Sequence, residues 1–150
     1  MKAKPTMLIL FLVFIFGCKT ENQKGVIKVN ETEAVALLDT LQLKLNHGKK
    51  WIVNLETQGG VVKMDAIIQK FKAENSKDYN GLGKKLSTQV GYIIKNCSMV
   101  GESHDQLHVV LVPMLDVISN LKEAKNITEG AVYLEKLEAL INDFFLYFKI

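Results

Sequence analysis

Apolar residues recur every three or four positions along most of the chain, which is the spacing of one face of an α-helix. The clearest series alternates steps of four and three without a miss. Its members are Leu86, Val90, Ile93, Cys97, Val100, His104, Leu107, Leu111, Met114, Ile118 and Leu121. Such a heptad seam is typical of helices that pack at shallow angles in a bundle.

A single helix through this whole series would be about 40 residues and nearly 60 Å long at 1.5 Å per residue, which is too long for a compact domain of this size. The alternative is a hairpin broken at 101–103, where Gly101 stops one helix and Ser103 caps the next. Gln106 lies three residues after Ser103, the spacing of a capping box. We therefore predict two antiparallel helices joined by a tight turn at 101–103.

Three other segments also have helical spacing. The first begins at Glu31 and ends at His47-Gly48, where we expect His47 to cap the helix C-terminus; its apolar face is Ala34, Leu37, Leu38, Leu41 and Leu45. The second runs from Val61 to about Asn75, between a break at 58–60 and a turn at 78–83. The third starts near Thr128, with Tyr133, Leu137, Leu140, Ile141, Phe144 and Phe148 along its apolar face.

No segment has the alternation of a strand ladder, so the predicted fold is all-α, an antiparallel bundle of four to five helices. Trp51 lies between the first two helical segments, and we expect it to cover the core. The run 144–148 is apolar on more than one face, so it either caps the core or binds something.

The N-terminus carries a second pattern. Lys2 and Lys4 precede an apolar run over 6–16, which has the length of a signal-peptide h-region and is too short to span a bilayer. Ile15-Phe16-Gly17-Cys18 follows and resembles the lipobox of bacterial lipoproteins. That resemblance implies cleavage before Cys18, acylation of its thiol with palmitate-type chains, and a membrane anchor in the cell envelope.

The predicted organisation is thus a signal peptide at 1–17, a lipidated polar tether at 18–30 and one helical-bundle domain at 31–150. The expected location is the outer membrane, facing the periplasm or the cell surface. The alternative is a plain secretory signal in which Cys18 is not modified. Two or more acyl chains would anchor the protein stably, since each buried methylene adds about 0.8 kcal/mol.

Charge excludes one class of partner. Removing residues 1–17 takes away two lysines and no acid, which leaves seventeen basic residues against sixteen acidic ones. All the basic residues are lysines, whereas proteins that read nucleic acids rely on the planar fork of arginine. We expect no nucleic-acid partner, and any partner, such as the membrane or an envelope protein, is not selected by bulk charge.

Candidate chemistry gathers between Cys97 and His108. These twelve residues hold Cys97, Met99, His104 and His108. Histidines four apart on a helix face the same way, and a hairpin would bring Cys97 to the same end. Imidazole, thiolate and thioether are ligands suited to copper or zinc. Asp105 is placed to orient an imidazole from the second shell. The sequence therefore predicts a soft-metal site for buffering, sensing or delivery.

Other interpretations of the same residues stay open. In the main one the protein is a non-catalytic structural or interaction lipoprotein, and Cys97, His104 and His108 are core residues. If Cys18 is acylated, Cys97 has no disulfide partner in its own chain, so it is buried, metal-bound or paired with another molecule. A b-type haem held by His108 with Met114 or Met64 is a further alternative, whereas the absence of CxxCH excludes c-type haem.

We expect no enzymatic activity. His104-Asp105-Gln106-Leu107-His108 resembles the HExxH helix of zinc peptidases, but Asp105 is one methylene shorter than the glutamate that activates water there. A second resemblance is broader. The Cys-x-Met-x-Gly-x-x-His-x-x-x-His segment, here 97–108, is similar to one in helical lipoproteins of Gram-negative bacteria. It implies a helical bundle in the cell envelope and brings no established activity.

Overall fold

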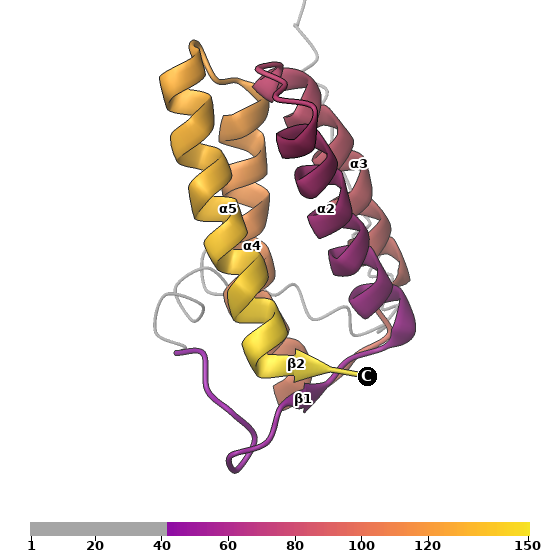
Figure 1. Cartoon of the computed structure of the whole chain (residues 1–150). Coiled ribbons are helices and arrows are strands. Elements are labelled where there is room, and N and C mark those ends of the chain that lie inside the picture. The colour runs from indigo at the N-terminus through magenta and orange to yellow at the C-terminus, as the bar shows by residue number, and fades with distance from the viewer. Residues whose placement is uncertain (1–41) are drawn as a thin grey trace, which may run out of the picture.

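The computed structural model describes residues 42–150, which form a bundle of four helices closed at one end by a short strand pair (Figure 1). The helices are α2 (Leu55–Ala73), α3 (Tyr79–Asn96), α4 (Glu102–Lys122) and α5 (Ile127–Tyr147). Strands β1 (Trp51–Ile52) and β2 (Phe148–Lys149) pair in parallel. The predicted all-α bundle is confirmed. The signal peptide, Cys18, the tether and most of the first predicted helix lie outside the described residues.

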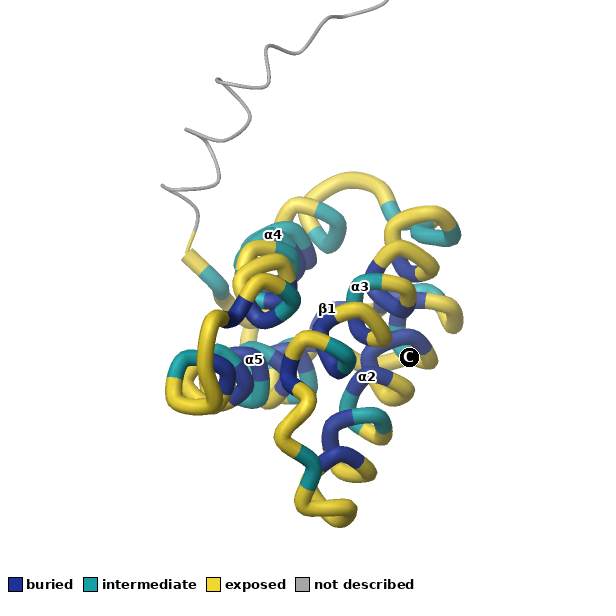
Figure 2. Tube along the Cα trace, turned by 90° about the horizontal axis from the view of Figure 1, so that it is seen from above, coloured by how far each residue is buried: buried dark blue, intermediate teal, exposed yellow. Residues whose placement is uncertain are grey.

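The core is a single cluster of apolar side chains contributed by all four helices and both strands. Figure 2 shows the buried positions of each helix turned toward the middle of the bundle. Most of the heptad series lies there: Leu86, Val90, Ile93, Leu107, Leu111, Met114, Ile118 and Leu121 are all buried. None of the helices in the described part is both long and apolar enough to cross a membrane.

The predicted break into two helices within the heptad series is confirmed, but the tight turn predicted at 101–103 and its capping are wrong, since residues 102 and 103 already belong to α4. Residues 97–101 separate α3 from α4, and Gly101, with φ 68°, occupies the N-cap position. Ser103 Oγ donates to Val100 O instead of capping α4. The Gln106 side chain is buried and binds the segment before β1. Its Oε1 accepts from Lys44 N, and its Nε2 donates to Gln42 O.

Two predicted breaks in the sequence are also wrong. Helix α2 begins at Leu55, so the glycines at 59 and 60 lie inside it, and Gly60 faces Ile93 of α3. The segment 78–83 is the start of α3, since the Asp78 carboxylate accepts from Gly81 N and caps the helix. In both places the glycines sit inside helices that tertiary packing holds together.

The chain before β1 is not helical where the structure describes it. Asn46 and Lys49 exchange two backbone hydrogen bonds around His47 and Gly48, whose φ angles are 49° and 80°. Positive φ at both central residues is the type I′ turn of a two-residue hairpin. The helix predicted to continue to His47 is therefore wrong over 42–47, and His47 is a turn residue instead of a helix cap.

The strand pair closes the core at this end of the bundle. It was not predicted, because two residues are too few to show alternation. Trp51 is paired in register with Phe148, and both side chains are buried. Trp51 Nε1 donates to Lys44 O at 2.6 Å, so the tryptophan covers the core as expected. Phe144 stacks on Phe148 with ring centroids 5.1 Å apart, which shows that the C-terminal aromatic run caps the core.

Candidate functional site

The predicted site residues lie at the connection between α3 and α4. Helix α3 ends at Asn96, and Cys97 is its C-cap residue with an extended backbone, ψ 116°. The non-helical linker that follows consists of residues 97–101 and includes Met99. His104 and His108 lie on the first two turns of α4, one turn apart. The four residues thus come from a helix end, a linker and a helix start, all at the end of the bundle that carries β1 and β2 (Figure 1).

The two histidines are brought together as predicted. Their ring centroids are 4.4 Å apart, and the rings meet edge to face at 79°. Both side chains are half-buried. Within residues 42–150 neither imidazole takes part in a hydrogen bond, and neither ring carries a nitrogen that is both buried and unpaired. The nitrogen atoms of these two adjacent imidazoles are thus unpaired within the described part of the chain.

The surroundings of the pair lower the pKa of His108 below its ordinary value of 6.5. The main cause is burial, which disfavours the charged imidazolium. The neighbouring His104 acts in the same direction, and the Asp105 carboxylate opposes both. Asp105 thus influences His108 through its charge, although it donates or accepts no hydrogen bond with either ring in the described part of the chain. At neutral pH the His108 ring is neutral, the form that binds metals.

Cys97 and Met99 are placed differently from the prediction. Both are half-buried and pack against the apolar core, and the Cys97 thiol is free. Across residues 42–150 no three His, Cys, Asp or Glu side chains are grouped so that they could hold one metal ion. Cys97 therefore does not complete a ligand set with the histidine pair. The heptad register placed Cys97 and His104 in the core seam, but α3 ends at Asn96, and neither residue is fully buried.

Two neighbouring contacts were not foreseen from the sequence. Lys44 Nζ lies 2.9 Å from Glu102 Oε1, and both side chains are largely exposed. Together with the bonds from Gln106, this pair ties residues 42–44 to the first turn of α4. The methionines considered as haem ligands, Met64 and Met114, are both core residues with almost no exposed surface.

We expect the pH dependence of stability to reveal the environment of His108. Because its pKa is lowered on folding, the unfolded chain binds this proton more readily than the folded one. Above pH 6.5 His108 is neutral in both the folded and the unfolded chain, and it does not lower the free energy of unfolding. As the pH falls from 6.5 through the lower pKa of the folded state, the unfolded chain takes up the proton first, and the free energy of unfolding decreases. Urea unfolding between pH 7.5 and 5 measures this loss, and His108→Gln should remove it.

A matched control is His47→Gln, since His47 is exposed in the hairpin turn. It should leave the loss that is due to His108 in place. In an NMR titration His104→Gln should move the pKa of His108 upward, because the neighbouring imidazole that lowers it together with burial is gone. An unaltered His108 titration in that variant would mean that the rings do not interact.

No protein-family model, no curated protein and no solved structure matches this chain.

Proposed function

We propose that this chain is a lipid-anchored protein of the bacterial cell envelope whose helical bundle holds a soft transition-metal ion, copper or zinc, at His104 and His108. One observation carries the proposal. Two half-buried imidazoles lie with ring centroids 4.4 Å apart on consecutive turns of α4, without hydrogen-bond partners in the described residues. Neither ring carries a buried, unpaired nitrogen, so an ion can bind to the pair without breaking a hydrogen bond of the described residues.

The chemistry of the pair suits such an ion. Neutral imidazole is a ligand for both copper and zinc, and the lowered pKa of His108 means that no proton has to be displaced from it at neutral pH. Histidines at i and i+4 direct their rings to one side of a helix, so a single ion can contact both. Two ligands on one helix leave other coordination positions open, which favours exchange of the ion over a closed structural site.

Cys97 and Met99 are the proposed further ligands. They sit at the start of the linker, 97–101, whose far end is tied to α4 because Gly101 O accepts from His104 N and Asp105 N. Their sulfur atoms would have to leave the core surface to reach an ion at the histidine pair. Metal binding would then reshape the linker, which is a way for a buffering, sensing or delivery protein to signal that it is loaded.

The second candidate is a non-catalytic structural or interaction lipoprotein. It is favoured by the packing of Cys97 and Met99 against the core, which needs no metal to explain it. The two candidates share the lipid anchor at Cys18 and differ in whether the histidine pair binds an ion. Metal content therefore separates them.

The test uses the chain from residue 18 with Cys18→Ser, loaded with copper or zinc under reducing conditions. One ion per chain is expected. His104→Ala and His108→Ala should each weaken binding by more than the 10- to 100-fold that loss of an outer-shell partner costs. His47→Ala is the matched control and should bind normally. Absence of stoichiometric metal, or equal binding by all of these variants, would remove the metal proposal and leave the interaction protein.

Cys97→Ser tests the sulfur ligands separately. If the linker contributes its thiolate, this variant should hold the ion more weakly than the parent chain and His47→Ala do. Lipidation has its own measurement, the incorporation of labelled fatty acid by cells expressing the full chain. Label should appear in the parent chain and be absent from Cys18→Ser, and an unlabelled parent would overturn the anchor.

A further inference from the structure

The strand pair at the closed end of the bundle has one face that packs on the core and one face that is exposed. Strand pairing turns Trp51 and Phe148 inward, while Ile52 and Lys149, which are partners in register, point outward. Ile52 is 60% exposed although it is apolar. Lys49, Lys50, Ile52 and Lys149 line one shallow hollow together with Asn46. We refer to these three lysines and the isoleucine as the lysine face.

The lysine face is positive, and no described residue that lines it carries a compensating charge. No acidic residue lines the hollow, and none of its three lysines forms an ion pair within residues 42–150. Lys50 Nζ donates to Phe145 O at 2.6 Å, which fixes that side chain against the end of α5. Lys49 and Lys149 make no such side-chain bond in the described part of the chain and are exposed. Two ammonium groups are thus available to a partner.

Further exposed apolar side chains lie close to Lys149 in sequence. Leu146 and Ile150, which are near Lys149 in sequence, are each 61% exposed. An apolar tip among lysines is the composition of surfaces that rest on membranes, where ammonium groups meet lipid phosphates and the tip enters the headgroup region. A surface that bound only a soluble anion would not need the apolar part.

Residues 42–44, the first of the described chain, also lie at this end. Gln42 and Lys44 are hydrogen-bonded to Gln106 in the first turns of α4, and Figure 1 shows this segment at the end of the bundle that carries β1 and β2. Cys18 precedes Gln42 by 24 residues, which can span at most about 80 Å. That reach is longer than the bundle, since a 21-residue helix such as α4 is about 32 Å long. An anchor alone would therefore not decide which surface meets the membrane.

We propose that the lysine face docks on the anionic phospholipid surface to which the chain is anchored and so sets the orientation of the bundle. This inference rests on the proposed lipid anchor for its location, but the docking itself needs no acyl chain. Lys49 and Lys149 pair with lipid phosphates, and Ile52 enters the headgroup region. The face is a local feature, so it is compatible with the near-neutral charge of the mature chain.

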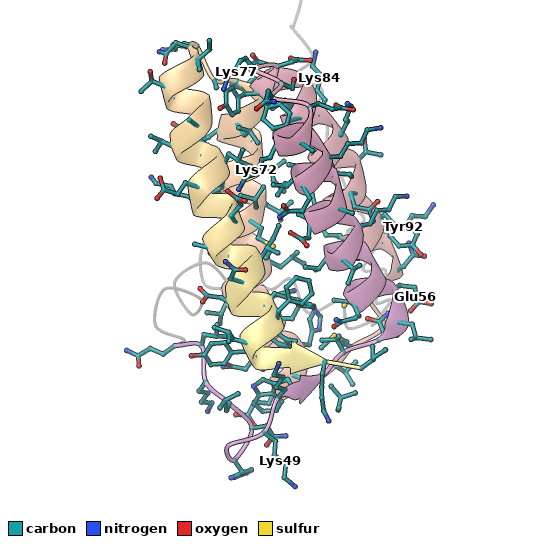
Figure 3. All side chains as sticks on the ribbon, viewed as in Figure 1. Lys49, Glu56, Lys72, Lys77, Lys84 and Tyr92 are labelled. Carbon is teal, nitrogen blue, oxygen red and sulfur yellow. The ribbon has the colours of Figure 1, made fainter. Side chains whose placement is uncertain are left out.

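The experiment measures binding of the Cys18→Ser chain from residue 18 to vesicles of phosphatidylglycerol mixed with phosphatidylcholine, and to pure phosphatidylcholine. We expect binding to the anionic vesicles alone, with release at 1 M salt, where the screening length is about 3 Å. Lys49→Glu/Lys149→Glu should weaken it by at least about 25-fold, at roughly fivefold per lysine. Lys77→Glu/Lys84→Glu is the matched control, because it makes the same charge change at the opposite end (Figure 3).

Ile52→Gln should also weaken binding while leaving the charge unchanged. Absence of binding to anionic vesicles by the unlipidated chain would overturn the docking proposal. Equal losses in the two lysine pairs would overturn it as well, because bulk charge would then explain the binding. The fatty-acid label at Cys18 reports on the anchor independently. If the full chain is labelled but its unlipidated form does not bind vesicles, the lipid anchor is supported and the docking of the lysine face is refuted.

Discussion

Replacing Phe144 by alanine is expected to lower the free energy of unfolding by about 3–5 kcal/mol. The Phe144 ring has no exposed surface and lies where α5 meets the strand pair. It stacks on Phe148 at 5.1 Å and meets Phe145 edge to face at 5.6 Å. Alanine would leave a cavity under β2 and remove both ring contacts, so the closed end of the bundle would lose much of its packing.

Phe145→Ala is the matched control for this prediction. It removes the same side chain from the same helix, but Phe145 is only half-buried, and solvent can fill part of the space. We expect a clearly smaller loss. Urea unfolding measures both variants, with the midpoint shifted and the slope unchanged if the folded state is otherwise intact. Equal losses would mean that the ring of Phe144 is not packed as described.

The second large effect is expected at Gly83, where the backbone of α3 lies close to the backbone of α4. A Cβ atom there would lie 2.6 Å from the backbone nitrogen of Lys122 and 2.7 Å from its Cα. Backbone atoms cannot move aside as a side chain can, so the two helices would have to separate. Gly83→Ala should therefore lower the free energy of unfolding by about 1–3 kcal/mol.

Gly91→Ala is the control on the same helix, with the opposite sign. A Cβ at Gly91 would meet nothing within 4 Å, and glycine inside a helix is less favourable than alanine by about 0.5–1 kcal/mol. The variant should be stabilised by about that amount. Thermal or urea unfolding of the pair compares the two values directly. Stabilisation by both substitutions would contradict the close approach of α3 and α4.

The apolar spacing of the sequence predicted the bundle well, because each helix buries one stripe of side chains. The hairpin between α3 and α4 followed from the length of the heptad series together with Gly101. Glycine pairs misled the prediction at 59–60 and 81–83, since packing against α3 and α4 outweighs their low helix propensity. The strand pair joins Trp51 to Phe148, and no local pattern reports a contact so distant in sequence.

The candidate site was predicted in part. The i, i+4 spacing of His104 and His108 was enough to bring their rings together on α4. The position of Cys97 depended on where α3 ends, and helix ends are set by tertiary contacts as much as by sequence. Gln106 shows the same limit, because it matches a capping box but bonds to residues 42 and 44 instead. The lysine face could not be predicted from the sequence, because net charge does not show which charged residues lie side by side in the fold.

The most direct test of the metal proposal is an X-ray absorption spectrum of the zinc-loaded chain. We predict two imidazole nitrogens at about 2.0–2.1 Å, and a sulfur shell at about 2.3 Å if the Cys97 thiolate joins them. The imidazole signal should weaken in His104→Ala or His108→Ala and persist in His47→Ala. A spectrum without imidazole ligands, or with the same imidazole signal in all three variants, would contradict a metal site at His104 and His108.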